Sequence, residues 1–333
     1  TQGIPLDITD VFSTYLYEGN GSSQTITNDI DLSGEGGLVW IKSRGGSRNH
    51  CLTDTERGAY TSIASNLTSQ KRGANTVTSF LSSGFTVAHD TNDAVFANTT
   101  NVSGEEYASW TFRKAPKFFD VVTYSGDGSS NRQIAHNLGS TPGFILIKRT
   151  DSTGNWLAWH KEVNPGYGIL DLTLAFTAGA NGFFNAVADT YFETSWLNTS
   201  GGTFVAYLFA HNDSGDGEFG PDSDQDIIKC GSYTGNGSAT GPVIDLGFEP
   251  QWLLVKRSDA GTDQWLMLDT MRGWPSGGTV KRLWANGADS EGNAAWASMY
   301  LSATGFQPAA TDSTINTNGA TYIYMAIRRG PLA

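Results

Sequence analysis

Several features that are common in other protein classes are scarce in this chain. Only two of the 333 residues are cysteines, Cys51 and Cys230, and two cysteines cannot build a disulfide framework. Charged residues make up 16% and the net charge is −12, with no basic stripe of the kind that would bind phosphates, which argues against a nucleic-acid partner. No apolar run approaches the roughly 18 residues of a membrane-spanning helix, and no secretion-type leader opens the sequence. We therefore expect no membrane insertion.

Catalytic signatures are also missing. The sequence contains no P-loop, no Gly-x-Ser-x-Gly elbow and no HExxH motif. Glu105 and Glu106 are neighbours on a predicted strand, so they point to opposite faces and cannot act together on one sugar. Histidines occur at five positions without metal-ligand spacing: His50, His89, His136, His160 and His211. We expect no enzymatic activity, no metal site and no cofactor.

Turn-forming and strand-forming residues dominate what is present. The chain contains 40 glycines and 12% aromatic residues, together with many Ser, Thr and Asn residues. This composition is poor in helix formers and rich in residues that favour strands and tight turns. Aromatic and β-branched residues recur in short regular runs, which is not typical of disorder. The composition predicts an all-β protein.

One pattern occurs three times along the chain, which indicates tandem repeats. Each copy begins with a short apolar strand that ends in Tyr17, Tyr124 or Tyr233, followed by a Gly-Asn-Gly or Gly-Asp-Gly turn. Glycine, and to a lesser extent Asn and Asp, tolerates the positive φ of a tight bend. A run of apolar residues before a Lys then predicts a strand covered on both faces. These runs are "GLVWIKSR" (37–44), "GFILIKRT" (143–150) and "QWLLVKRS" (251–258).

Each copy closes with a strand that alternates large and small residues, at 105–114, 202–211 and 320–329. Copies of this size, with many short strands, fit β-sandwiches of jelly-roll or lectin-like topology, each closed around its own core. The predicted domains are three tandem β-sandwich repeats and one acidic linker. Their boundaries are 1–116, 117–213 and 227–333 for the repeats and 214–226 for the linker.

Two polar patterns are candidates for a site. The acidic joint before the third repeat is rich in carboxylates, but its spacing differs from that of a calcium loop, and a solvated linker is the favoured interpretation. In the first and third repeats an Asp and an Arg three residues apart precede a Gly, as Asp54–Arg57 and Asp269–Arg272. Such a pair closes a turn through a charge-assisted hydrogen bond. The middle repeat has "HKEVNPG" (160–166) there instead, so we expect structural turns.

Aromatic residues are the remaining candidates for ligand binding. Sugar rings stack on exposed aromatic faces, and Trp274 and Trp284 lie among Gly, Pro and polar residues that predict a loop. Trp is more often buried than exposed, and Trp296 is a weaker candidate than the other two. Trp274 and Trp284 are therefore the predicted glycan-binding residues, with burial as the alternative.

Beyond these patterns, the chain resembles a repeat domain of virion proteins from marine tailed phages. The resemblance is carried by "YTGNGSATGPVIDLGFEPQWLLVKRSD", "WLMLDTMRG", "NTNGATYIYMAIRRGP" and "WTFRKAPKFFDVVTYSGDG", and it extends from about Tyr15 to Pro331. It implies a structural virion protein on the particle exterior, such as a tail fibre or tail-attached protein, built of lectin-like sandwiches. The implied partners are other virion proteins, further copies of the chain and host surface polysaccharide. Among the possible oligomers of the chain, a trimer is favoured. The resemblance supplies no catalytic residues.

Three other functions stay open at this point. A capsid-decorating head protein could use the same repeat, and tight sugar binding by the isolated monomer would favour a free carbohydrate-binding protein. A glycan-cleaving depolymerase would need two close carboxylates in one cleft, which the sequence does not indicate.

Overall fold

A computed structural model describes residues 5–179, 182–274, 279–296 and 298–330 of the chain. Antiparallel strands provide nearly all of its regular structure, and the helical elements in those residues are α1 (Ile8–Val11) and the 3-10 turn η1 (Lys161–Val163). None of these helical elements is long and apolar enough to cross a membrane. The all-β sandwich fold predicted from composition and repeats is confirmed.

In the first repeat, the longer strands pair in the order β1-β9-β3-β4, and a smaller sheet pairs β2-β8-β7. The strands are β1 (Phe12–Glu18), β2 (Gln24–Thr27), β3 (Gly37–Ser43), β4 (Cys51–Asp54), β5 (Thr61–Ser62), β6 (Arg72–Gly73), β7 (Val77–Leu81), β8 (Gly84–Val87) and β9 (Glu106–Arg113). Side chains from both sheets, such as Val39 of β3 and Phe85 of β8, share one buried cluster.

The second repeat has the same order, β10-β18-β12-β13, extended by β14-β15, and a smaller sheet β11-β17-β16. Its strands are β10 (Phe119–Ser125), β11 (Arg132–Ala135), β12 (Phe144–Arg149), β13 (Leu157–His160), β14 (Gly166–Ile169), β15 (Thr177–Ala178), β16 (Ala186–Val187), β17 (Tyr191–Thr194) and β18 (Thr203–Phe209).

The third repeat again follows this order, β19-β27-β21-β22, extended by β23-β24, and a smaller sheet β20-β26-β25. Its strands are β19 (Ile228–Thr234), β20 (Ile244–Asp245), β21 (Pro250–Arg257), β22 (Leu266–Asp269), β23 (Val280–Trp284), β24 (Gly292–Ala294), β25 (Met299–Ser302), β26 (Gly305–Pro308) and β27 (Thr321–Arg328). The sequence repeat therefore corresponds to a repeated strand order, although the domain boundaries proposed above stay a prediction.

The opening Tyr and the turn after it hold the loop that precedes each closing strand. In the first repeat the Tyr17 hydroxyl donates to the Thr100 carbonyl at 2.6 Å, and its ring stacks on Tyr107 at 5.0 Å. A Cβ on Gly19 would lie 2.1 Å from the Val102 carbonyl oxygen, so only glycine permits this approach. The same contacts recur at Tyr124, Tyr233, Gly126 and Gly235.

A buried asparagine completes this anchor in every repeat. Asn316 accepts a hydrogen bond from the backbone N–H of Asn236 at 2.9 Å and donates to the carbonyls of Ser238 at 2.7 Å and Ala310 at 3.1 Å. It is fully buried, as are its counterparts Asn101 and Asn198. The Gly-Asn-Gly turn is thus held to the loop before the closing strand by this asparagine, an arrangement that we call the loop-to-loop lock.

Replacing Asn316 by alanine is expected to lower the free energy of unfolding by about 2–3 kcal/mol, because buried backbone groups lose their partners. Urea denaturation followed by circular dichroism measures this change. Asn318→Ala, in the same loop but exposed, is the matched control and should change stability by less than about 0.5 kcal/mol. Equal effects of the two substitutions would contradict the proposed lock.

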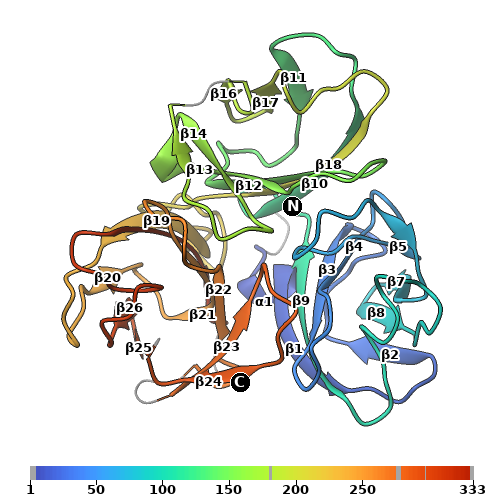
Figure 1. Cartoon of the computed structure of the whole chain (residues 1–333), viewed down its shortest axis with the longest axis horizontal. Coiled ribbons are helices and arrows are strands. Elements are labelled where there is room, and N and C mark those ends of the chain that lie inside the picture. Colours follow the sequence, from blue (N-terminus) through green and yellow to red (C-terminus); the bar gives the residue numbers. More distant parts are fainter. Residues whose placement is uncertain (1–4, 180–181, 275–278, 297, 331–333) are drawn as a thin grey trace.

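The three repeats lie around a common centre, with the first in blue to teal, the second in green to yellow and the third in orange to red (Figure 1). One buried cluster contains residues from all three of them. Its aromatic side chains include Phe112, whose ring centre lies 5.5 Å from that of Phe209 and 6.1 Å from that of Trp252. The expectation that each repeat closes around its own core therefore needs correction: the first and third repeats keep clusters of their own, but all three also share this central one.

The acidic segment 214–226 packs against the start of the chain. Phe219 within it is buried and meets Phe118 at 6.5 Å, and the Gly220 N–H donates to the Leu6 carbonyl at 2.8 Å. A Cβ on Gly330, near the other end, would lie 2.8 Å from the Thr9 side chain. Both ends of the described chain thus lie beside each other. Phe219 anchors the acidic segment, while its carboxylates at Asp216, Glu218, Asp222 and Asp224 are exposed to solvent.

Candidate functional site

The strongest polar constellations lie in the contact surfaces between repeats, which we call seams. Each seam contains one equivalent main-chain hydrogen bond. A backbone N–H in a loop of one repeat donates to a carbonyl of the neighbouring repeat, two residues after the Lys that follows each apolar run. These bonds run from Glu291 to Arg44, from Lys71 to Thr150 and from Phe176 to Ser258, at 2.8, 3.0 and 2.8 Å. The third repeat thus docks on the first, the first on the second and the second on the third. The seams form a closed ring within one chain.

A second contact is repeated in all three seams. His50, Trp156 and Trp265 occupy equivalent positions just before β4, β13 and β22. The Trp156 indole N–H donates to the Ala64 carbonyl at 2.8 Å, and that of Trp265 to the Ile169 carbonyl at 3.3 Å. His50 Nε2 lies 2.9 Å from the Trp284 carbonyl. Since His50 Nδ1 accepts from the Trp40 indole at 2.8 Å, its Nε2 carries the proton and donates, like the indoles.

The Asp54–Arg57 pair closes its turn and also reaches across a seam. Arg57 donates its backbone N–H to Asp54 Oδ1 at 2.8 Å and its Nε to Oδ2 at 2.6 Å. The Tyr207 hydroxyl of the second repeat donates to the same Oδ2 at 2.8 Å. Both side chains of the pair are almost fully buried. The turn therefore recognises one aromatic residue of the neighbouring closing strand.

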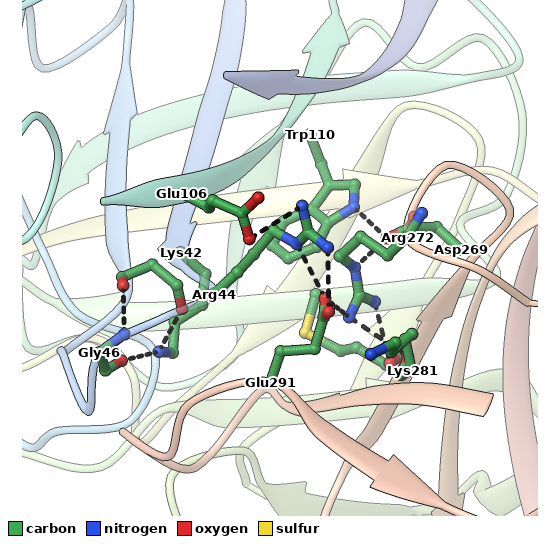
Figure 2. Close-up of polar contacts among 11 residues, drawn as sticks. Lys42, Arg44, Gly46, Glu106, Trp110, Asp269, Arg272, Lys281 and Glu291 are labelled. Carbon is green, nitrogen blue, oxygen red and sulfur yellow. Dashed lines mark hydrogen bonds and ion pairs between the residues drawn. The ribbon is translucent and has the colours of Figure 1, made fainter. Parts of the chain in front are cut away.

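The Asp269–Arg272 pair does the same at the seam between the third and first repeats (Figure 2). Asp269 Oδ2 accepts from Arg272 Nε at 2.6 Å and from the indole N–H of Trp110 at 3.0 Å. The Arg272 guanidinium carbon lies 5.5 Å from the centre of the Trp110 ring. Trp110 on β9 occupies the position of Tyr207 on β18, so the two turns contact equivalent aromatic donors.

The third seam replaces both partners. The equivalent position on β27 is Met325, which has no N–H or O–H to donate. The facing turn carries His160 in place of Asp, and its Nε2 lies 3.0 Å from the Tyr324 carbonyl. Because His160 Nδ1 accepts from the Glu162 N–H at 3.3 Å, Nε2 is the donor. An Asp at this turn would find no donor on Met325, and His160 instead donates to a backbone carbonyl.

Glu291 links the third repeat to the first through a bidentate pair with Arg44 (Figure 2). Arg44 Nε and Nη2 both lie 3.0 Å from the carboxylate oxygens of Glu291. Arg272 Nη1 approaches the same carboxylate at 3.4 Å. The hydrogen bond to Glu291 raises the pKa of Arg44. One carboxylate therefore joins two arginines, one from each side of the seam.

The conserved lysines of β3, β12 and β21 are fully buried near the seams. Lys148 Nζ donates to the Thr68 carbonyl of the first repeat, and Lys256 Nζ to the Thr173 carbonyl of the second, both at 2.8 Å. Lys42 Nζ donates to the Ser43 carbonyl at 2.8 Å. Burial lowers the pKa of all three lysines to about 8. Lys148 and Lys256 thus donate across a seam, whereas Lys42 donates within its own repeat.

Acidification is expected to weaken the seams. Burial lowers the pKa of His160 to about 4 and that of His50 to about 3, so the folded state keeps them neutral. Between pH 6.5 and pH 4.5 the unfolded chain binds protons that the folded chain does not. Stability therefore falls as the pH decreases, by about 2 kcal/mol for each of these histidines over that range.

Urea midpoints at pH 6.5 and pH 4.5 measure this loss of stability. In His160→Gln the titrating group is absent while a side-chain N–H donor remains, so the decrease on acidification should be smaller by about 2 kcal/mol. An unchanged decrease in this variant would contradict the assignment.

The expectation that Trp274 and Trp284 expose their ring faces is wrong. The two side chains are only 3% and 5% exposed. Trp274 donates its indole N–H to the Met299 carbonyl at 2.9 Å and belongs to the core of the third repeat together with Trp284. Their polar sequence surroundings suggested a loop, part of which, residues 275–278, lies outside the described residues. Trp296 and Trp196 are the tryptophans with large exposed faces, at 41% and 59%.

The nucleophilic and metal-ligating residues are dispersed. Cys51 and Cys230 are buried free thiols, and burial raises the pKa of both. Within the residues that the structure describes, no three His, Cys, Asp or Glu side chains are grouped so as to hold a metal ion. The seams present polar groups to one another, and an open cavity of about 360 Å³ lies where Arg57 and Lys71 of the first repeat face Thr150 of the second.

Most seam residues were missed by sequence reasoning. Thr68, Ala64 and Ile169 contribute only backbone carbonyls, which every residue type has, so the sequence does not reveal them. The equivalent residues His50, Trp156 and Trp265 could have been identified, because each repeat has a side chain with a ring N–H at this position.

A family of known sequences matches almost the whole chain. Residues 7–331 match the model of a family described as "Domain of unknown function (DUF7483)". No curated protein matches the chain. Since the match spans nearly the whole chain, the protein belongs to the DUF7483 family, whose function is undefined.

Proposed function

We propose that the chain is a structural component of a tailed-phage virion, a tail fibre or tail-attached protein on the particle exterior that contacts host surface glycans. The closed ring of seams is the observation that carries this proposal. Three equivalent contacts, each with buried hydrogen bonds, hold the repeats in one body. Such a body suits a scaffold exposed to mechanical load, and repetition provides several display surfaces. The resemblance of the repeat to virion proteins supports the same function.

Copies of the chain would associate through surfaces other than the seams, because the ring already uses them within one chain. We expect several copies in the assembly, with a trimer favoured, and multivalent display would strengthen weak glycan contacts. Analytical ultracentrifugation of the purified chain measures this association.

Cryo-electron microscopy of the particle tests the location. Density that fits the three-repeat body on the tail would support the proposal. Density on the capsid lattice would instead favour the head-decorating alternative. If an antibody against the chain labels no particles, the virion proposal fails and a free carbohydrate-binding protein becomes the better interpretation.

A further inference from the structure

An open groove of about 420 Å³ lies on the third repeat. Trp284 and Trp296 line one part of it, and polar side chains line the rest, among them Gln264, Asp312 and Thr314. None of these residues takes part in the seam contacts described above through its side chain. The groove therefore requires an explanation other than assembly of the ring.

Trp296 is partly exposed and stacks on a buried tryptophan. Its ring stacks on Trp284, with centres 5.9 Å apart and planes inclined by 26°. Trp284 is buried while Trp296 is 41% exposed, so the pair leads from the core to the surface. Trp is enriched at binding surfaces because its ring is apolar while its N–H can reach polar groups.

Arg282 packs its guanidinium against both rings. Its guanidinium carbon lies 4.6 Å from the centre of the Trp284 ring and 5.6 Å from that of Trp296. Its Nε and Nη1 are buried and have no hydrogen-bond partner in the described part of the chain, and burial lowers its pKa. Buried arginine nitrogens are normally paired. In place of hydrogen bonds from Nε and Nη1, the Arg282 guanidinium lies against these two aromatic rings.

The polar side of the groove offers both a donor and acceptors. Asp312 Oδ1 accepts from the Thr314 N–H at 2.9 Å, while its second oxygen has no partner among the described residues. The Gln264 amide likewise makes no hydrogen bond there, and it can both donate and accept. Asp263 is held in place by the Ser313 hydroxyl at 2.6 Å. A ligand with several hydroxyl groups would match this set.

We propose that this groove binds a neutral pyranose ring of a glycan, with one face of the sugar stacked on Trp296 and its hydroxyls bonded to Gln264 and Asp312. The apolar face of a pyranose matches the indole, and its hydroxyls match the amide and the carboxylate. A neutral sugar is favoured because the groove carries carboxylates and the chain has a net charge of −12. The inference rests on the glycan-contact part of the proposed function and supplies its site and ligand class.

A glycan array of neutral, amino and acidic oligosaccharides tests the ligand class on the full chain. Isothermal titration with the best-bound neutral oligosaccharide then measures affinity for three proteins: wild type, Trp296→Ala and Trp196→Ala. Trp196 is also exposed, but it lies in the second repeat, far from the groove in sequence. We expect Trp296→Ala to weaken binding at least about tenfold, and Trp196→Ala to leave it unchanged, with both variants as stable as the wild type.

Three results would overturn the inference: no neutral oligosaccharide on the array is bound, only acidic ones are bound, or Trp296→Ala binds as tightly as the wild type. These outcomes are independent of the particle test. If the chain is located on the tail but lacks neutral-glycan binding, the groove assignment fails while the structural function stands. If the groove binds sugar but particles lack the chain, the virion proposal fails alone.

Discussion

Asp269→Ala is expected to lower the free energy of unfolding by about 3–5 kcal/mol, the range measured when one partner of a buried ion pair is removed. Asp269 accepts hydrogen bonds from Arg272 and, across the seam, from Trp110. Without the carboxylate, the fully buried guanidinium of Arg272 keeps its charge while losing its closest counter-ion. Chemical denaturation at neutral pH measures the loss, and the seam between the third and first repeats should open first.

Asp151→Ala provides the control for this experiment. Asp151 also pairs with an arginine, Arg149, at 2.9 Å, but about a third of each side chain is exposed. Exposed pairs contribute about 1 kcal/mol or less, so this variant should remain close to the wild type. If Asp269→Ala is no more destabilised than Asp151→Ala, the seam network does not stabilise the ring.

Phe112→Ala should be comparably destabilising, by about 3–5 kcal/mol, because it leaves a cavity in a packed core. The position of the cavity makes the effect distinctive. Phe112 contacts Phe209 of the second repeat and Trp252 of the third, within the cluster that all three repeats share. Hydrogen exchange followed by mass spectrometry should therefore show faster exchange in strands of every repeat.

Phe85→Ala removes a ring of the same size from a different place. Phe85 is fully buried in the cluster private to the first repeat. The loss of stability should be similar, but the faster exchange should be concentrated in the first repeat. Identical exchange patterns for the two variants would argue against a shared centre that couples the repeats.

Local sequence patterns predicted the strands well because strand formation depends on neighbouring residues. The run from Gly37 to Ser43 was predicted to be covered on both faces, and all seven residues of β3 are buried. The tight bend expected after Tyr17 is present, with Gly21 at a φ of 74°. These features follow from side-chain alternation and from the conformational freedom of glycine, both of which can be read within a few residues.

Contacts between repeats could not be predicted in the same way. The turn at Asp54 and Arg57 was expected from spacing, but its partner Tyr207 lies 153 residues away from Asp54. Nothing in the local pattern of β18 distinguishes a residue that faces a seam from one that faces its own core. Trp274 was misassigned for the opposite reason, since polar neighbours suggested a loop although its ring fills the core of the third repeat.

The closed ring has a consequence for chain connectivity. Thr9 and Gly330 lie in contact, and the third repeat docks on the first through the same main-chain bond as at the other two seams. The packing of the repeats alone therefore does not determine their order in the sequence. A circularly permuted gene that begins with the second repeat and ends with the first would keep all three interfaces if a linker joined the segments that meet at Gly330 and Thr9.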